Sequence, residues 1–264
     1  MGSLSIITVN YNDAQGLNRT LHSIDNVISK YDLNVELYVI DGGSKDESLN
    51  VIEKFKNIIT DHVSEKDNGI YDAMNKGLAL CDGDFVLFLN SGDYFNEDAS
   101  LDILITNMKQ YKNKVIFWSA KIKAESDFWF YPPLDVKSTD VWMNKNLPNH
   151  QAMLFPKCFY KKNRYDLSMK VISDADYKYR AIKEFGYVYI PLSLSTFEMG
   201  GLSSQKFTWK TLKIRLKDFL IYANKHYSGI KYILEVLKHT GKYTVKLLLS
   251  ILLSDDKYSK FFKK

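Results

Sequence analysis

Polar residues of the kind that bind ligands follow four short apolar runs in the first part of the chain. Each run predicts a buried β-strand, and the polar residues form the loop that leaves it. In an open parallel sheet such loops meet at the carboxyl edge, where ligands bind. One loop of this kind is ordinary turn chemistry, but four at one edge predict a site for a polar ligand. The loops are Asn10-Tyr11-Asn12-Asp13, Asp41-Gly42-Gly43-Ser44, Glu65-Lys66-Asp67-Asn68-Gly69 and Asn90-Ser91-Gly92-Asp93.

The first of these loops lacks the glycine patterns of two common nucleotide-binding folds. Neither G-x-G-x-x-G nor G-x-x-x-x-G-K-[ST] follows the first predicted strand, so a dinucleotide fingerprint and a P-loop are both excluded there. The alternative is a nucleotide whose base and ribose are held by carboxylates and amides. Its diphosphate would be neutralised by a divalent ion on an Asp, because carboxylate oxygens suit hard cations.

Strand and helix patterns alternate through residues 1–90, and this order positions the four loops. It predicts an α/β fold in which a mainly parallel sheet is covered by helices on both faces. In this part strands are predicted at 4–9, 35–40, 58–64 and 85–89, and helices at 13–28, 47–55 and 68–80. Beyond residue 93, strands are predicted at 115–119, 151–155 and 187–190, and a strand or hairpin arm at 122–131. Helices are predicted at 101–111, 173–185, 207–226 and 228–253.

Seven segments, in order, carry a resemblance to a known enzyme family. The chain resembles the inverting family 2 glycosyltransferases of bacterial cell-surface polysaccharide synthesis over about residues 3–205. The resemblance implies a GT-A fold, which has a Rossmann-like sheet flanked by helices, and a sugar-nucleotide donor. The segments are SIITVNYN (5–12), VIDGGSKDES (39–48), SEKDNGIYDAMNKGL (64–78), DFVLFLNSGDYF (84–95), NHQAMLF (149–155), KVISDADYKYRAIKEFG (170–186) and FEMGGLS (197–203).

The resemblance assigns a nucleotide-binding role to residues of the four loops. They are Val9, Asn10, Tyr11, Asp41, Asp67 and Ser91. A carboxylate at Asp41 can accept both a base N–H and a ribose hydroxyl. A purely structural alternative for Asp67 is the cap of the helix that follows, and the two roles are compatible.

The same resemblance assigns the metal, the base and an acceptor contact. Asp93 matches the metal motif and is its only remaining carboxylate, as a ligand of Mn²⁺ or Mg²⁺. Asp174 matches the general base that takes the proton of the attacking hydroxyl, with Asp176 as the alternative base. One of the two is expected to catalyse and the other to cap or orient the helix. His150 matches a residue that contacts the acceptor or the diphosphate.

The formal net charge of +5 hides an acidic body and a basic tail. Residues 206–264 hold fourteen Lys and Arg against four Asp and Glu, a net +10, which leaves −5 for residues 1–205. We therefore predict a catalytic domain at 1–205, with a nucleotide half at 1–93 and an acceptor half at 94–205, and a basic helical extension at 206–264. The extension either lies on an anionic membrane surface or packs as a helical subdomain. No motif accompanies the charge, so nucleic acid is not an expected partner.

The predicted activity is transfer of a hexose or N-acetylhexosamine, with inversion, from a UDP-sugar to a glycan hydroxyl. The resemblance implies a growing acceptor on a polyprenyl diphosphate, as in O-antigen or capsule synthesis. Two cysteines and the lack of a signal-peptide pattern predict a cytoplasmic protein. The family resemblance, together with the basic extension, implies a position at the inner face of the cell membrane. The alternatives are a sugar-nucleotide-binding module without activity and a nucleotidyltransferase.

Overall fold

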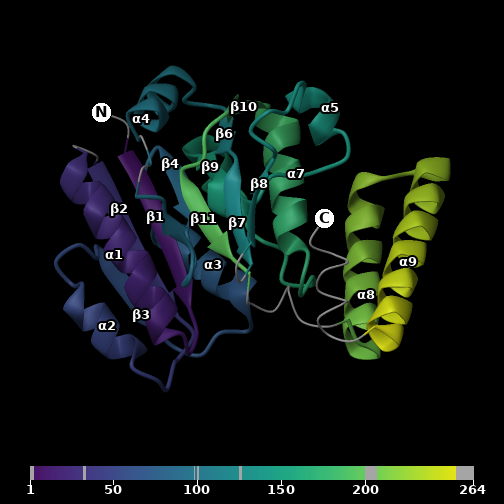
Figure 1. The fold of residues 1–264 in the computed structure, drawn as a ribbon, viewed down its shortest axis with the longest axis horizontal. Helices are drawn as coiled ribbons and strands as arrows, with labels where there is room; N and C mark the ends of the chain where they lie inside the picture. The colour runs from purple at the N-terminus through teal and green to yellow at the C-terminus, as the bar shows by residue number, and fades with distance from the viewer. Residues whose placement is uncertain are drawn as a thin grey trace. The chain divides into compact units, whose positions relative to one another are not determined.

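The computed structural model describes residues 3–31, 34–97, 99, 101–124, 127–199 and 207–253 (Figure 1). The chain divides into two compact units, which are described separately. Unit 1 comprises Met1–Tyr165 and Tyr177–Met199, and unit 2 comprises Asp166–Asp176 and Gly200–Lys264. Of the predicted basic extension, Lys206 and residues 254–264 lie outside the described residues.

Unit 1 contains a seven-stranded sheet with the order β10-β6-β9-β4-β1-β2-β3. Strands β1 to β4 are parallel, β10 is parallel to β6, and β9 runs antiparallel to both β4 and β6. The predicted α/β class and mainly parallel sheet are therefore confirmed. The strands are β1 (Ser3–Asn10), β2 (Asn34–Asp41), β3 (Asp61–Ser64), β4 (Phe85–Phe88), β6 (Val115–Trp118), β9 (Met153–Pro156) and β10 (Tyr187–Ile190).

A second, four-stranded sheet in unit 1 was not predicted. Its strand order is β5-β11-β7-β8. The segment predicted as a strand or hairpin arm at 122–131 forms most of β7 and all of β8, which pair as an antiparallel hairpin. β5 and β11 are too short to give a readable alternation of apolar and polar residues. The strands are β5 (Tyr94–Phe95), β7 (Ala120–Ala124), β8 (Asp127–Tyr131) and β11 (Ser195–Glu198).

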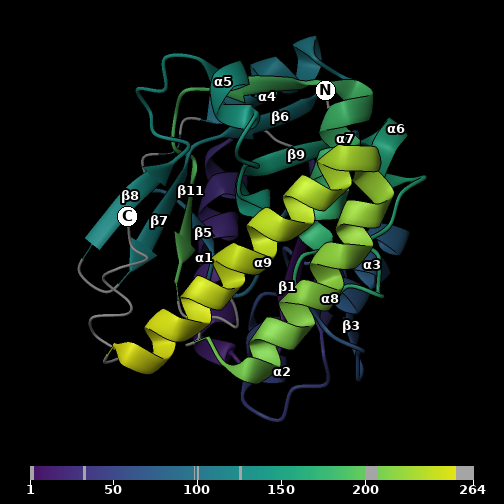
Figure 2. The same ribbon diagram turned by 90° about the vertical axis from the view of Figure 1, so that its right-hand side faces the viewer.

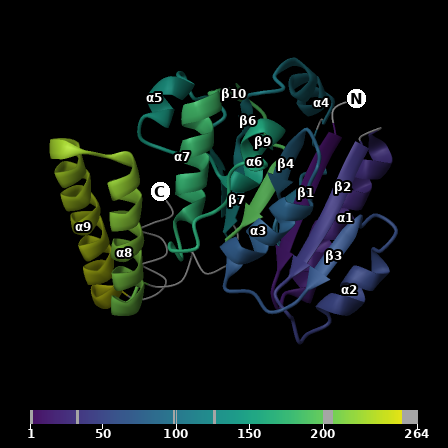
Figure 3. The ribbon, with the colours of Figure 1, turned by 180° about the vertical axis from the view of Figure 1, so that it is seen from behind.

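Helices cover both faces of the main sheet because successive strand residues point to opposite sides. Leu4 and Ile6 of β1 pack in one apolar cluster with α1, α2 and α4, whereas Ile7 and Val9 pack in a second cluster with α3, α6 and α7. Figure 3 views the side that carries α3, α6 and α7. The helices of this unit are α1 (Ala14–Lys30), α2 (Ser48–Lys54), α3 (Ile70–Leu80), α4 (Leu101–Gln110), α5 (Thr139–Met143), the short 3₁₀ turn η1 (His150–Ala152), α6 (Lys157–Tyr160) and most of α7 (Ser173–Phe185).

Unit 2 is a pair of long helices that run side by side, α8 (Trp209–His226) and α9 (Gly229–Leu252) (Figure 2). Phe219 of α8 stacks on the ring of His239 of α9 with centroids 3.8 Å apart. The segment Asp166–Asp176 belongs to this unit because Asp218 of α8 accepts the backbone N–H of Val171 at 2.6 Å. In the parts of the chain that are described, no helix has both the length and the apolar character needed to cross a bilayer.

Candidate active site

The last residues of three neighbouring strands meet in one buried hydrogen-bond network. Asn10, Asp41 and Ser64 end β1, β2 and β3 and lie opposite one another in register. The Asp41 carboxylate accepts from the Asn10 amide at 2.8 Å and from the Ser64 hydroxyl at 2.7 Å. It also accepts from the hydroxyl of Ser44 at 2.5 Å and from its backbone N–H at 2.9 Å.

These hydrogen bonds decide the charge of Asp41. The side chain is fully buried, and burial alone would raise the pKa. The donors of Ser44, Ser64 and Asn10 outweigh that effect and lower the pKa of Asp41 below its ordinary value. An ionised carboxylate therefore orders the loops after β1, β2 and β3, and its oxygens are already used by the protein's own donors.

Two of the predicted nucleotide residues converge above Gly42. A Cβ atom at Gly42 would lie 2.5 Å from Asp67 Oδ2 and 3.2 Å from Tyr11 Cδ2. Tyr11 is 66% exposed, and Asp67 is half-buried and accepts the N–H of Gly69 at 2.9 Å. The structure thus brings together the loops after β1, β2 and β3, with the exposed Tyr11 ring and the half-buried Asp67 carboxylate both next to Gly42. Val9 takes part only through its backbone, because its side chain is in the core.

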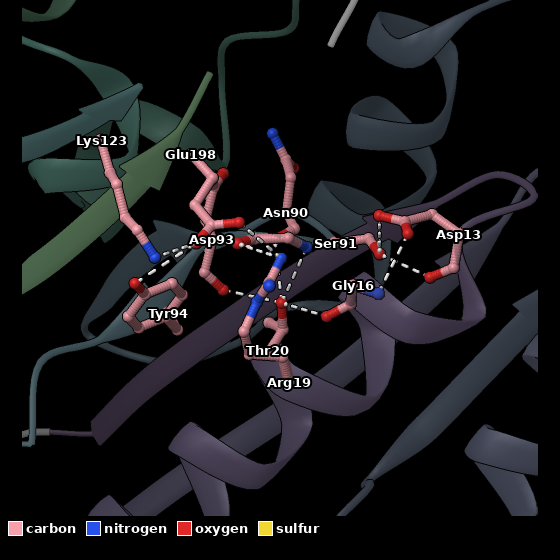
Figure 4. A network of polar contacts seen from close by, with 11 residues as sticks. Asp13, Gly16, Arg19, Thr20, Asn90, Ser91, Asp93, Tyr94, Lys123 and Glu198 are labelled. Carbon is pink, nitrogen blue, oxygen red and sulfur yellow. Dashed lines mark hydrogen bonds and ion pairs between the residues drawn. The ribbon is translucent and has the colours of Figure 1, made fainter. Parts of the chain in front are cut away.

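The loop after β4 is fixed to the start of α1 (Figure 4). Asp13 caps α1 by accepting the N–H of Gly16 at 3.0 Å, and the hydroxyl of Ser91 lies 3.1 Å from the Asp13 carboxylate. The hydroxyl of Thr20 accepts the N–H of Gly92 at 3.0 Å. Gly92 has φ 95°, a left-handed conformation that strains any residue with a side chain. A second carboxylate at this position of the motif would not fit the observed backbone without strain.

Asp93, the predicted metal ligand, turns into the protein. Its side chain is 4% exposed and accepts hydrogen bonds from the Gln151 side chain and the backbone N–H of Glu198. Burial, together with the nearby Glu198 carboxylate, raises the pKa of Asp93 well above its ordinary value. Because the carboxyl is buried and accepts from Gln151 and Glu198, its oxygens are directed away from the edge where a donor diphosphate would bind, which does not favour it as the ligand of a divalent ion there.

The surrounding residues offer no replacement cluster. Across residues 3–31, 34–97, 99, 101–124, 127–199 and 207–253, no group of three or more His, Cys, Asp or Glu side chains is arranged to hold a metal ion. Glu198 is instead occupied by two cations, with Arg19 at 2.9 Å and Lys123 at 3.0 Å. The metal assigned to Asp93 therefore remains a prediction that this geometry does not favour.

His150 joins the same edge of the sheet from an antiparallel strand. η1 leads into β9, and because β9 runs opposite to β4, the start of β9 lies beside the end of β4. The Nε2 atom of His150 is 3.4 Å from the Nδ2 atom of Asn90. The amide oxygen of Asn90 is buried and has no hydrogen-bond partner among the described residues. Such an atom commonly marks a place for a ligand or an ordered water.

The two candidate bases lie in the first turn of α7, within unit 2, and differ in burial. Asp176 is fully buried, and its Oδ1 atom lies 2.8 Å from Nε2 of His226 and 3.9 Å from Nζ of Lys225, both of α8. Asp174 is half-buried. Breaking a buried pair leaves an uncompensated charge, so Asp176 has a structural role. Asp174 is the more accessible of the two carboxylates.

Three residues of the Asp93 environment were not predicted. Gln151 directly follows His150 in a segment that had been recognised, so its neighbour gave a usable signal. Glu198 lies in the segment FEMGGLS (197–203), which carries the family resemblance, but no role was predicted for it, and Arg19 lies on a helix where charged residues are usually solvated. Their contact depends on the pairing of β11 with β5 and β7, which the sequence pattern did not indicate.

Residues 5–172, more than half of the chain, match the sequence profile of Glycosyl transferase family 2. The chain belongs to this family. As a family 2 member it is a glycosyltransferase, and an uncharacterized glycosyltransferase of Mycobacterium tuberculosis, Rv1514c, is 28% identical over 217 residues, covering 77% of this chain and 78% of that protein.

Solved structures of glycosyltransferases share the fold. TarS 1-349 of Staphylococcus aureus, in complex with UDP-GlcNAc, has a TM-score of 0.67 at 16% identity and covers 91% of this chain and 72% of that chain. The mannosyltransferase PcManGT of Pyrobaculum calidifontis, in complex with GDP-Man and Mn²⁺, has a TM-score of 0.61 at 12% identity, with coverage of 99% and 79%. The predicted GT-A fold is confirmed.

The Asp41 network predicts a pH-dependent loss of stability. Asp41→Asn should lower the free energy of unfolding at pH 7 by about 1–3 kcal/mol, because an amide would face N–H and O–H donors. The pKa of Asp41 is lower in the folded state than in the unfolded state. The stabilisation that the ionised Asp41 gives is therefore fully present above the unfolded-state pKa and is lost as the pH falls through the folded-state pKa. Urea unfolding should therefore show a smaller difference in free energy of unfolding between the parent protein and Asp41→Asn at about pH 3.5 than at pH 7.

The control for this experiment is Asp135→Asn, which changes an exposed carboxylate in the same unit. It should leave the unfolding midpoint unchanged at both pH values. A loss of equal size for the two variants would show that Asp41 is not the organising charge.

Proposed function

We propose that this chain transfers a hexose or N-acetylhexosamine, with inversion at the anomeric carbon, from a UDP-sugar to a hydroxyl of a growing cell-surface glycan. Membership of family 2 supports the reaction class, which is glycosyl transfer within EC 2.4. The convergence of Tyr11 and Asp67 over Gly42 carries the proposal. A planar base can stack on the exposed Tyr11 ring while Asp67 accepts its N–H group.

Asn10, Asp41 and Ser91 support this pocket in different ways. Asn10 and Asp41 are buried and fix the loops that present Tyr11 and Asp67. Ser91 is held against the helix cap at Asp13, which keeps the loop after β4 close to the start of α1. The donor's diphosphate is assigned to this loop, with His150 and Asn90 as its neighbours.

Asp174 is our proposed general base. Inversion in one step requires a group that takes the proton of the attacking hydroxyl on the face opposite the leaving diphosphate. Asp174 lies in the first turn of α7, where the helix dipole favours an ionised carboxylate. Asp176 is occupied by His226 and serves to orient the turn.

A divalent ion, Mn²⁺ or Mg²⁺, stays a prediction of the family resemblance. A structural neighbour was solved with Mn²⁺ and GDP-Man, which supports testing for one. The buried position of Asp93 argues against that residue as the ligand, so no step of the proposed reaction is assigned to a metal here.

The acceptor is proposed to be a glycan linked to a lipid, such as a polyprenyl diphosphate, at the cytoplasmic face of the cell membrane. TarS of Staphylococcus aureus is named a poly(ribitol-phosphate) β-N-acetylglucosaminyltransferase, and its similarity to this chain, 26% identity over 216 residues covering 70% of this chain and 36% of TarS, supports a polymeric acceptor. The basic extension supports an anionic acceptor or surface.

A second candidate is a sugar-nucleotide-binding module without activity. The observation that favours it is the metal motif, in which Gly92 has a left-handed backbone and Asp93 is buried. Slow hydrolysis of UDP-GlcNAc by the purified protein separates the two, because an inactive module would bind the donor and release no UDP.

Gly42→Ala tests the proposed nucleotide pocket. The added methyl group would meet Asp67 Oδ2 at 2.5 Å and must displace it, so affinity for UDP should fall on the order of tenfold. Isothermal titration calorimetry with UDP and with GDP measures the change. Gly241→Ala is the matched control, because a Cβ atom at Gly241 has open space around it. Unchanged UDP affinity in Gly42→Ala would show that the nucleotide does not bind between Tyr11 and Asp67.

Asp174→Asn and Asp176→Asn test which of the two carboxylates acts as the general base and which has a structural role. Asp174→Asn should lower kcat for UDP release in the presence of acceptor by roughly 10²–10⁴-fold with little change in melting temperature. Asp176→Asn should lower the melting temperature, because it removes the charge partner of His226. If Asp176→Asn kept its melting temperature and lost more turnover, the two assignments would be exchanged.

Asp93→Asn tests the metal assignment. The amide matches the carboxyl in size and can still accept from the Glu198 N–H, so the fold should be retained. We expect any stimulation of UDP release by Mn²⁺ to be the same in Asp93→Asn as in the parent protein. Loss of that stimulation, with an intact melting curve, would make Asp93 the metal ligand after all.

A further inference from the structure

Helix α9 has two faces of different character, and only one of them packs within unit 2. The inner face carries His239, Tyr243, Leu247 and Ser250, spaced by three or four residues. Tyr243, Leu247 and Ser250 are buried, and His239 stacks on Phe219 of α8. Ser250 also donates to the backbone carbonyl of Phe207 at 2.7 Å. These contacts fix which side of α9 faces α8.

The opposite face of α9 carries exposed apolar side chains near both ends of the helix, in two groups at 230–237 and 245–252. Within each group they recur every three or four residues, and both groups lie on the same side of the helix, so together they form one stripe that is interrupted at Gly241 and Thr244. At 1.5 Å per residue the stripe is about 33 Å long. Its ends, Ile230 and Leu252, are 70% and 76% exposed, and Leu237 near the middle is 64% exposed. The stripe consists of Ile230, Ile233, Leu234, Leu237, Val245, Leu248, Ile251 and Leu252.

A row of lysines borders this stripe along one side. Lys231, Lys238 and Lys242 are exposed and follow the stripe at helical spacing. Among the described residues of α9, Glu235 is the one acidic side chain. The neighbouring α8 adds four Lys and one Arg against Asp218, which is buried. The stripe therefore lies on a strongly basic pair of helices.

We propose that the outer face of α9 docks on an anionic lipid bilayer, with the helix lying in the plane of the interface. Soluble proteins rarely leave an apolar strip of this extent in water. A helix with one apolar face and lysines beside it is the form that binds at the lipid headgroup level. Lysines near the surface strengthen the contact because the leaflet carries negative charge.

Charge complementarity selects the bilayer over a second copy of this chain. Two copies joined through this face would bring two basic helix pairs together, which like-charge repulsion opposes. An anionic bilayer satisfies both the apolar stripe and the lysine row. The inference deepens the proposed function by naming the surface through which a lipid-linked acceptor is reached, and it rests on that function only for the acceptor's identity.

Vesicle sedimentation with the full chain tests the proposal without donor or acceptor. Vesicles of phosphatidylcholine alone are compared with a two-to-one mixture of phosphatidylcholine and phosphatidylglycerol. The parent protein should sediment with the anionic vesicles and less so at high salt. Leu237→Glu/Leu248→Glu should reduce partitioning at least tenfold, since it puts charges in the stripe. Lys238→Gln/Lys242→Gln should reduce binding to anionic vesicles on the order of tenfold.

The matched control is Leu49→Glu/Val141→Glu, which introduces the same charges at two exposed apolar residues of unit 1. It should partition like the parent. Recovery of the parent in the supernatant, or equal sedimentation of the α9 variant and the parent, would overturn the proposal. So would a dimer in lipid-free buffer that the α9 variant dissociates. UDP binding measured on the same variants reports on the proposed function separately and should not change.

Discussion

The arrangement of the nucleotide edge depends on one buried carboxylate. Asp41 stays ionised without an opposing side-chain charge, because amide, hydroxyl and backbone donors surround it. Those donors come from the ends of β1 and β3 as well as from its own loop. The network therefore joins three consecutive parallel strands at the level where their loops leave the sheet. The exposed Tyr11 and the half-buried Asp67 have defined positions because the buried Asn10 and Asp41 fix the loops that carry them.

The loop after β4 is held in place by contacts with the α1 region and not by the Asp41 network. Its backbone is held by Thr20 and Asp13 of the α1 region, and its last carboxyl, Asp93, is directed inward to Gln151 and the backbone of Glu198. The residue to which the family resemblance assigns a metal thus connects the main sheet to β11. The two cations on Glu198 complete a network that stabilises the junction between the sheets, independently of what binds above it.

The fold of the first ninety residues could be predicted from the sequence, because the local pattern of apolar residues there matches the alternation of strands and helices in a parallel sheet. Residues 4–89 alternate short apolar strands with amphipathic helices, and each predicted element is present, with shifts of a few residues at the ends and a shorter third strand. The edge at which the four loops meet followed from parallel pairing alone. β9 was predicted as a strand, but its antiparallel direction, which brings His150 to this edge, depends on pairing with β4 and β6.

Burial was the second property that local sequence could not supply. Asp93 and Asp67 both follow predicted strands in polar loops, yet one points into the core and the other is half exposed. The difference comes from Gln151 and Glu198, which are far away in sequence. Similarly, Asp174 and Asp176 were distinguished by the contact of Asp176 with His226, a residue of the extension that the family resemblance does not reach.

The attachment of Asp166–Asp176 to α8 has a consequence for how this chain can vary. The turn that carries Asp174 is completed by side chains more than forty residues later, through Asp218, Lys225 and His226. A shortened chain that ends before Trp209 would retain every family motif and still lose the contacts of Asp218, Lys225 and His226 with this turn. Exchange of the C-terminal helices between relatives would succeed only if residues 166–176 were exchanged with them. The two segments are therefore expected to vary together in evolution, although they are separated in sequence.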